Sequence, residues 1–364
     1  MEVLKIQKKE INNQFIYWLL YFFLNYIHIR TYTIYYFLFC IFFQLKMEQK
    51  TKSNSPKLKS ILRNKNDHSP LLRSYTKNSY YTETKEIEDL CDLETGDISV
   101  YNPKAKSVSQ YAYEERKNKK YRNTMEDFNK IIDRIGKDPN KGYFSLFDGH
   151  GGTELVDYVR ERLYNIFISL YTKYSNNITK CFTKAFEIVD TELKKFPNIE
   201  NIGATGTVVF ISKETDVMFG TKKVAYCANI GDTRAVVLNS SGCKRLSYDH
   251  KCNDLFEVER IKKSGGNIVQ DRVLGKLALT RTFGDYAMKT FGVTATPSVN
   301  RMVLNESDKY IVICSDGVWD VIDEEDMFYN AFQFDDAKEF AEKIVDDAIE
   351  NGSTDNISCI VIKL

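Results

Sequence analysis

The sequence contains eight cysteines but no Cys-x-x-Cys pair. Cysteines spaced in this way provide neither the paired ligands of a typical zinc site nor the framework of a small disulfide-bonded domain. Cys227 and Cys314 also stand inside apolar runs. The pattern therefore favours buried free thiols and a reducing compartment over disulfides or zinc.

The sequence also lacks an excess of either charge, because 51 Lys and Arg residues face 50 Asp and Glu residues for a formal net charge of +1. A chain without a strong positive field is not expected to bind nucleic acid. The balance conceals an asymmetry, since residues 46–82 carry nine basic and two acidic residues whereas 83–364 is acidic overall. We therefore expect the basic segment to be separate from an acidic folded part.

No hydrophobic run is long enough by itself for a membrane-spanning helix, which needs roughly 18 to 20 apolar residues. The apolar stretches 15–27 and 34–43 are shorter and are interrupted by polar residues. Two interpretations of residues 1–46 remain open: a signal-anchor preceded by lysines, or an upstream extension with Met47 as the working start. No small-residue cleavage site follows, and no glycine follows either methionine to support N-myristoylation.

Residues 47–107 are rich in Lys, Ser, Asn and Thr and have few clustered apolar residues. Such a segment cannot bury enough apolar surface to offset the entropy lost on ordering. We therefore expect a flexible polar and basic tail over 47–107. A membrane could be reached only through residues 1–46, and without that anchor the expected location is the cytoplasm or the nucleus.

From residue 108 the pattern changes to that of one folded domain, 108–364. Apolar residues at helical spacing predict helices over 153–170, 178–193 and 335–350. Apolar runs separated by turn residues predict antiparallel strands over 206–212, 224–230 and 234–239. Helices grouped apart from antiparallel strands indicate an α+β layered fold.

Acidic residues stand at the ends of several predicted strands. Asp148 and Asp316 each end an apolar strand and are followed by glycine, and Asp355 comes just before the last strand. Glu126 and Asp127 precede another strand. Carboxylates gathered at one sheet edge would repel one another without a cation, and Mg²⁺ and Mn²⁺ prefer oxygen ligands. Two such ions would clamp a phosphate and activate a water for hydrolysis.

Taken singly, each motif has an ordinary structural explanation. Asp-Gly after a strand is usually a turn, and Arg122 and Glu126, four residues apart, could form a surface helix pair. The glycine-rich segment Asp148–Gly152 lacks the Lys-Ser/Thr ending of a phosphate-binding P-loop. The order of the motifs along the chain is therefore more informative than any one of them.

That order resembles the metal-dependent protein serine/threonine phosphatases, the protein phosphatase 2C family. The motifs that carry the resemblance are Arg122–Asp127, Asp148–Gly152, Gly231–Arg234, Asp249–Lys251, Leu277–Asp285, Asp316–Asp320 and Asp355–Asn356. Together they span about residues 108–364. The resemblance implies a four-layer α-β-β-α sandwich in which two central antiparallel β-sheets hold two Mg²⁺ or Mn²⁺ ions between their edges.

The resemblance also implies a role for each residue that matches a metal ligand of the family. Asp148 would bridge both metals and would act in catalysis, and Gly149 would offer its backbone carbonyl to one of them. Asp316 and Asp355 would bind the other metal.

Further acidic residues match positions around those ligands. Glu126 and Asp127 resemble the pair that holds metal-bound waters. Asp232 and Asp320 match positions that lie beside a third, weaker metal in some members of the family.

The implied reaction is the hydrolysis of phosphoserine and phosphothreonine in proteins by a water that bridges the two metals. Arg122 resembles the phosphate-binding arginine, a task for which the planar guanidinium is suited. His150 is the candidate general acid for the leaving alkoxide. No nucleophilic Cys or Ser is required. The alternative is a catalytically inactive scaffold that binds a phosphoprotein partner, against which the intact set of carboxylates argues.

The chain departs from the family pattern at two places. Gly203–Gly206 reads Gly-Ala-Thr-Gly where Gly-Ser-Thr-Ala is common, and Cys252 replaces a proline. We expect the variable segment 286–296 to shape the choice of substrate. The expected partners are phosphoprotein substrates, and the expected oligomeric state is a monomer.

Overall fold

The structure is a computed structural model that describes residues 88–91, 97–174, 177–216 and 220–364. All of them belong to one unit that spans 81–364. The stretches 1–46 and 47–87, for which an anchor or extension and a flexible tail were predicted, lie outside the described residues.

One β-sheet has seven strands, each antiparallel to its neighbours. In spatial order they are β1 (Glu88–Cys91), β2 (Ile98–Asn102), β3 (Gln110–Arg116), β16 (Ile357–Lys363), β15 (Asp308–Cys314), β9 (Arg234–Asn239) and β10 (Gly242–Arg245). The last strand of the chain, β16, therefore lies in the middle of this sheet, between β3 and β15.

The second sheet also has seven strands and is antiparallel. Its main path is β13 (Phe283–Gly284), β6 (Gly203–Ala204), β5 (Gly142–His150), β7 (Gly206–Asp216), β8 (Gly220–Ile230) and β14 (Ser298–Val303). Strand β4 (Asp127–Asp133) pairs with β5 and is joined to it through the short 3-10 helix η1 (Ile135–Lys137).

The alternation of side chains along the strands separates two apolar layers. On β5, Phe144 and Leu146 face the layer between the sheets, which they share with Ile313 of β15. Tyr143 and Phe147 point to the opposite face and pack under the helices. All of these side chains are fully buried, and burial of each contributes roughly 1.5 to 3 kcal/mol of hydrophobic free energy.

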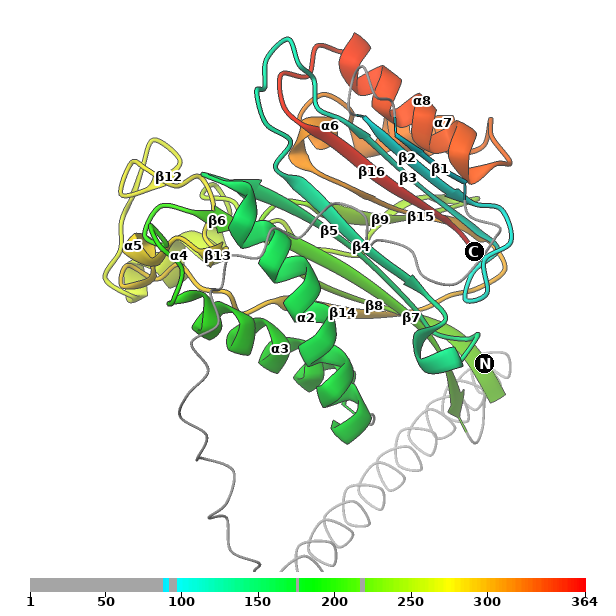
Figure 1. Cartoon of the computed structure of the whole chain (residues 1–364), viewed down its shortest axis with the longest axis horizontal. Helices are drawn as coiled ribbons and strands as arrows, with labels where there is room; N and C mark the ends of the chain where they lie inside the picture. Colours follow the sequence, from blue (N-terminus) through cyan, green and yellow to red (C-terminus); the bar gives the residue numbers. More distant parts are fainter. Residues whose placement is uncertain (1–87, 92–96, 175–176, 217–219) are drawn as a thin grey trace, which may run out of the picture. The chain divides into compact units, whose positions relative to one another are not determined.

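Helices cover the outer face of each sheet (Figure 1). Helices α2 (Thr153–Tyr174) and α3 (Ile178–Leu193) pack on the second sheet. Helices α6 (Asp316–Trp319), α7 (Glu324–Ala331) and α8 (Ala337–Glu350) pack on the first. This order of helix, sheet, sheet and helix confirms the predicted four-layer α+β sandwich with two central antiparallel sheets.

The expected start of the folded domain at residue 108 is too late. Strand β2 pairs with β3 from Ile98 opposite Glu115 to Asn102 opposite Tyr111, and β1 pairs with β2. The polar composition of the whole segment 47–107 conceals β2, whose own sequence is Ile-Ser-Val-Tyr-Asn. Within the sheet, the hydroxyl of Ser99 donates a hydrogen bond to the buried carboxylate of Glu114. The sheet therefore begins within the segment that was expected to be a flexible tail.

The segment between β10 and β14, residues 246–297, is called the insert below. It contains α4 (Leu255–Lys263), the hairpin of β11 (Ile268–Val269) and β12 (Arg272–Val273), strand β13, and α5 (Tyr286–Lys289). It has a small apolar core of its own, formed by Cys252, Ile261, Val273, Met288 and Val293.

The cysteines test a further expectation. Every described cysteine side chain is a free thiol, as predicted, with Cys243 half-buried and the others buried: Cys181, Cys227, Cys252, Cys314 and Cys359. None of the helices in the described part of the chain has both the length and the apolar character needed to cross a membrane. The apolar stretches 15–27 and 34–43 are not among the described residues.

The turn of the β11–β12 hairpin generates a prediction. Its two central residues, Gln270 and Asp271, are exposed and have φ values of 50° and 51°. A two-residue turn with positive φ at both positions suits Asn-Gly far better than Gln-Asp. We expect Gln270→Asn combined with Asp271→Gly to raise the free energy of unfolding by about 1 kcal/mol. Thermal denaturation followed by circular dichroism should show a melting temperature higher by roughly 2 to 4 °C.

Gly352 provides the matched control. Its φ is 85°, and no atom lies within 4 Å of the position that a β-carbon would take. Gly352→Ala therefore changes the backbone preference without a clash and should lower the melting temperature by a similar amount. Our account of the hairpin would be wrong if the double substitution left the melting temperature unchanged while Gly352→Ala lowered it.

His250 generates a second prediction, on the pH dependence of stability. Its ring is fully buried, with Nδ1 3.3 Å from the carbonyl oxygen of Gly231 and Nε2 2.8 Å from Oγ of Ser298. Burial, together with the positive charge of Arg281, lowers the pKa of His250 to about 3. A histidine in the unfolded chain binds a proton near pH 6.5. The contribution of the neutral His250 to the free energy of unfolding is therefore fully present above pH 6.5. It is lost as the pH falls from 6.5 to 3, at about 1.4 kcal/mol per pH unit.

Urea denaturation at pH 7, 6 and 5 tests this expectation. The free energy of unfolding of the wild type should fall more steeply with decreasing pH than that of His250→Gln, whose side chain does not titrate. Equal slopes for the two proteins would contradict the assignment of a neutral buried histidine.

Candidate metal centre

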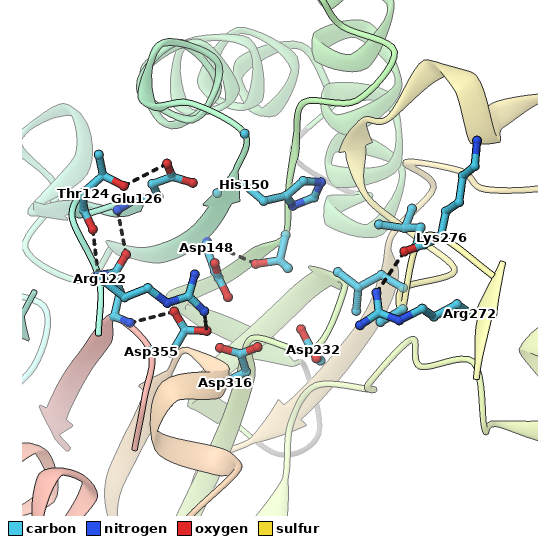
Figure 2. A pocket seen from close by; sticks show the side chains of 17 residues that line it. Arg122, Thr124, Glu126, Asp148, His150, Asp232, Arg272, Lys276, Asp316 and Asp355 are labelled. Atoms are coloured by element: carbon cyan, nitrogen blue, oxygen red, sulfur yellow. Dashed lines mark hydrogen bonds and ion pairs between the residues drawn. The ribbon is translucent and has the colours of Figure 1, made fainter. Parts of the chain in front are cut away.

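A pocket of about 500 Å³ lies where strands of both sheets end. Asp148, Asp232, Asp316 and Asp355 face it from separate parts of the chain (Figure 2). The other lining residues are Arg122, Thr124, Glu126, Gly149, His150, Gly151, Thr205, Arg272, Lys276, Leu277, Ala278, Leu279 and Asn356. The fold thus brings together most of the residues that the sequence singled out.

The register of β5 places Asp148 at the pocket. Asp148 lies opposite Asp127 of β4, and its backbone N–H donates to Oγ1 of Thr205 at 3.1 Å. The backbone carbonyl of Asp148 accepts from the N–H of Thr205 at 2.8 Å. At Gly149 a β-carbon would lie only 2.9 Å from the carbonyl oxygen of Glu126. Glycine therefore lets the chains of β4 and β5 approach closely beside the acidic residues.

A second glycine brings Asp316 and Asp355 together. A β-carbon on Gly317 would lie 1.9 Å from the carbonyl oxygen of Asn356, which no adjustment of a side chain could relieve. The turn after β15 can therefore rest against the turn before β16 only because residue 317 has no side chain.

Burial and mutual repulsion together act on the carboxylates of the pocket. Burial, followed by the charges of Asp316 and Asp127, raises the pKa of Asp148 well above its usual range. Burial and the charges of Asp232 and Asp355 likewise raise the pKa of Asp316. A cation between these groups would favour their charged forms and reverse both shifts.

Asp127 lies beside the pocket, outside the set of residues that line it. Its side chain is almost fully buried and accepts a hydrogen bond from the hydroxyl of Ser315 at 2.8 Å. Its neighbour Glu126 does line the pocket, and the N–H of Glu126 donates to Oδ1 of Asn356 at 2.9 Å. The two members of the acidic pair therefore have different surroundings.

Asp232 and Asp320 share a lysine. The Nζ atom of Lys251 lies 3.2 Å from Asp232 and 3.6 Å from Asp320. Asp232 is buried and lines the pocket, whereas Asp320 is exposed and does not. The ammonium group of Lys251 therefore already offsets part of the negative charge of the two residues that were assigned beside a third metal.

Arg122 lies at the pocket mouth, where its guanidinium forms an ion pair with Asp355. Its Nε atom also donates to the carbonyl of Thr354 at 3.3 Å. The loop that carries Arg122 is fastened by Asn356, whose side-chain amide donates to the carbonyls of Lys117 and Thr124. Asn356 directly follows Asp355 in the last motif, but its part in holding this loop was not predicted from the sequence.

His150 projects into the pocket with Nε2 2.9 Å from Oδ1 of Asp285 (Figure 2). Burial tends to lower the pKa of His150, but the hydrogen bond and charge of Asp285 overcome it and raise the pKa above the usual value. Asp285 reaches the ring because Gly203 is a glycine, where a β-carbon would lie 2.2 Å from the carboxylate. Asp285 was not predicted as a partner of His150. Its position as the final residue of the motif Leu277–Asp285 could have indicated this role.

The donors in the pocket fit a hard cation. They are carboxylate oxygens and the backbone of Gly149, which is the oxygen chemistry that Mg²⁺ and Mn²⁺ prefer. Within the described part of the chain, no three His, Cys, Asp or Glu side chains already form a metal-binding group. The donors are spread around the pocket, which suits ions that retain several of their waters.

The part of the insert that lines the pocket differs from the part that was predicted from the sequence to shape substrate choice. The segment 286–296 was expected to shape substrate choice, but none of its residues lines the pocket. Arg272 and the run from Lys276 to Leu279 line it instead. Helix α5 within 286–296 packs against the small core of the insert through Met288, and it therefore supports this wall from behind.

Comparisons with known proteins agree with the fold. The sequence model of the family described as Protein phosphatase 2C matches residues 111–357. Protein phosphatase 2C homolog 1 of Schizosaccharomyces pombe is 31% identical over 287 residues, which cover 78% of this chain and 82% of that protein. The protein of the same name from Saccharomyces cerevisiae is 30% identical over 259 residues, 69% of this chain and 92% of that protein.

A solved structure of a phosphatase from a pathogenic strain of Toxoplasma gondii has the same fold. It superposes with a TM-score of 0.62 at 23% sequence identity and covers 74% of this chain and 97% of its own. The family model and the two yeast relatives extend over most of the folded unit described above. The chain therefore belongs to the protein phosphatase 2C family.

Proposed function

We propose that this chain hydrolyses phosphoserine and phosphothreonine in proteins with the help of two Mg²⁺ or Mn²⁺ ions. The observation that carries the proposal is the convergence of Asp148, Asp316 and Asp355 on one pocket, with pKa values of Asp148 and Asp316 raised by burial and neighbouring charge. The names of the yeast relatives support a protein phosphatase as the class of enzyme.

Asp148 and the carbonyl of Gly149 would hold one ion, and Asp148, Asp316 and Asp355 the other, with Glu126 and Asp127 acting through waters. When bound, such ions supply positive charge to a phosphate and lower the pKa of a water to near neutrality. Asp127 is held in place for this by the hydroxyl of Ser315. Of the two residues considered for a third ion, Asp232 is the better placed, although that ion would have to replace the ammonium of Lys251.

Arg122 would orient the substrate. Its guanidinium already holds a carboxylate, Asp355, at the mouth of the pocket, and a phosphate offers the same pair of oxygens. Since the side chain is about half exposed, with 48% of its surface accessible, it can turn toward a phosphate that enters from solvent. Its role is to hold the phosphate oxygens in place while the ester bond breaks.

His150 would supply the proton that the leaving serine or threonine oxygen needs. Its raised pKa favours the protonated form of the ring over that of an ordinary histidine. Because Nε2 is engaged by Asp285, the proton for the substrate would be carried on Nδ1. Asp285 is a positioning residue that fixes the ring orientation.

The first test is metal-dependent turnover by the purified chain. We expect phosphate release from a phosphothreonine peptide with Mn²⁺ or Mg²⁺ and its loss with excess EDTA, because the carboxylates repel a phosphate unless cations are present. A malachite-green assay measures the release. Binding of the phosphopeptide with no release under any metal would instead support the alternative, a catalytically inactive scaffold.

Two substitutions separate the metal ligands from the proton donor. Asp148→Ala should lose Mn²⁺ binding and activity together, because it removes the carboxylate shared by both ions. His150→Ala should keep Mn²⁺ binding while kcat falls by about 100-fold, the usual contribution of a general acid. Isothermal titration with Mn²⁺ and steady-state kinetics give the two readouts. Unchanged Mn²⁺ affinity in Asp148→Ala would show that the ligand assignment is wrong.

A further inference from the structure

Two basic side chains of the insert line the pocket and have no role in the reaction proposed above. Arg272 and Lys276 lie on the side of the pocket away from Arg122, with Asp148, Asp232 and Asp316 between (Figure 2). Both side chains belong to exposed residues. A substrate whose phosphate reached the carboxylate region would therefore pass close to them.

The backbone holds these two residues in a defined arrangement. The guanidinium of Arg272 donates to the carbonyl of Lys276 at 2.9 Å. The turn between them is closed by hydrogen bonds from the N–H of Gly275 to Arg272 at 3.2 Å and from the N–H of Lys276 to Val273 at 3.0 Å. Arg272 and Lys276 are thus neighbours on one tight turn.

This turn is maintained at a conformational cost. Leu274 has a φ of 50°, a left-handed conformation that leucine rarely adopts. Its N–H donates to the carbonyl of Asn267 at 2.8 Å, and the half-buried side chain packs against the small core of the insert. The nearby turn residues Gln270 and Asp271 also have positive φ values. Several strained residues therefore lie together on the wall of the pocket, which is typical of functional sites.

Three other basic residues in this part of the described structure have carboxylate partners. Arg281 pairs with Glu257, Lys251 with Asp232, and Arg122 with Asp355. Among the described residues, Arg272 and Lys276 have no carboxylate within ion-pair distance, and the printed hydrogen bond of the Arg272 guanidinium is to a backbone oxygen. Their charges are therefore available to an anion from outside the chain.

We propose that Arg272 and Lys276 form an anion subsite that selects phosphopeptides carrying a second negative charge close to the phosphorylated residue. This deepens the proposed function and rests on it. The second charge is either a carboxylate or another phosphate, since a guanidinium next to an ammonium can bind both. The phosphorylated residue occupies the carboxylate region while the second anion contacts the turn of the insert.

The size of the effect follows from the exposure of the two groups. Exposed charge pairs are weak and are screened by salt, so the preference should be about five- to ten-fold and should shrink as ionic strength rises. It should appear in kcat/KM for peptides, since the second anion lies outside the reacting bond.

The experiment uses the Mn²⁺-loaded full chain and phosphothreonine peptides that differ at one position. Series with Ala, Glu, phosphoserine or Lys are made at each of three positions on either side of the phosphothreonine. We expect Glu and phosphoserine to raise kcat/KM over Ala, and Lys to lower it, at one or more positions. An increase with phosphoserine alone would support the subsite and identify a second phosphate as its occupant.

Substitutions locate the preference. Arg272→Gln combined with Lys276→Gln should reduce the ratio of kcat/KM for the acidic and Ala peptides to about one. The control is Lys262→Gln combined with Lys263→Gln on α4, which removes two exposed charges outside the pocket lining and should leave the ratio as in the wild type. The ratio is compared within each protein, so a general change in activity does not affect it.

Several results would overturn the proposal. Equal kcat/KM for Ala, Glu and phosphoserine peptides at every position, or an unchanged ratio after Arg272→Gln and Lys276→Gln, would exclude the subsite while leaving the proposed function intact. Absence of hydrolysis of every peptide would instead count against the proposed function. In that case fluorescence anisotropy of the labelled peptides bound to the same variants still gives the comparison, and equal affinities would exclude the subsite.

Discussion

The repulsion among the carboxylates of one pocket is the constraint on which the rest of the structure depends. Asp148 lies near the end of β5, Asp316 begins α6 just after β15, and Asp355 lies just before β16. Burial and the neighbouring charges raise the pKa values of Asp148 and Asp316. An assembly of this kind disfavours folding unless cations bind, because each charge opposes its neighbours. The surrounding fold must therefore be stable enough to hold like charges together.

Apolar layers and close backbone contacts supply that stability. The layer between the sheets and the layers under the helices are built from fully buried side chains on alternate strand positions. At the pocket itself, Gly149 and Gly317 let backbones approach to distances that any side chain would prevent. The same rigid frame positions Arg122 through Asn356 and His150 through Asp285. Hydrophobic burial thus offsets the electrostatic cost of the site.

The insert is a different kind of structure from this frame. Its small core and the buried carboxylate of Glu257, which binds Arg260 and Arg281, hold a wall of the pocket in place. The residues on that wall, Arg272 and Lys276, can vary without disturbing the carboxylates, since they contact solvent and backbone. This separation allows the chemistry to stay constant while the preference for substrates changes.

Local pattern alone determined much about this chain. Helical periodicity predicted α2, α3 and α8, and apolar runs predicted the central strands. The order of the motifs, through their resemblance to the protein phosphatase 2C family, predicted the acidic residues that line the pocket. These features are readable because they repeat along the chain or stand next to a strand end. Only the tertiary structure decided that β2 joins the sheet, that Asp285 orients His150, and that Arg272 and Lys276 line the pocket. Each of these depends on a contact between separate segments of the chain, and no local periodicity records such a contact.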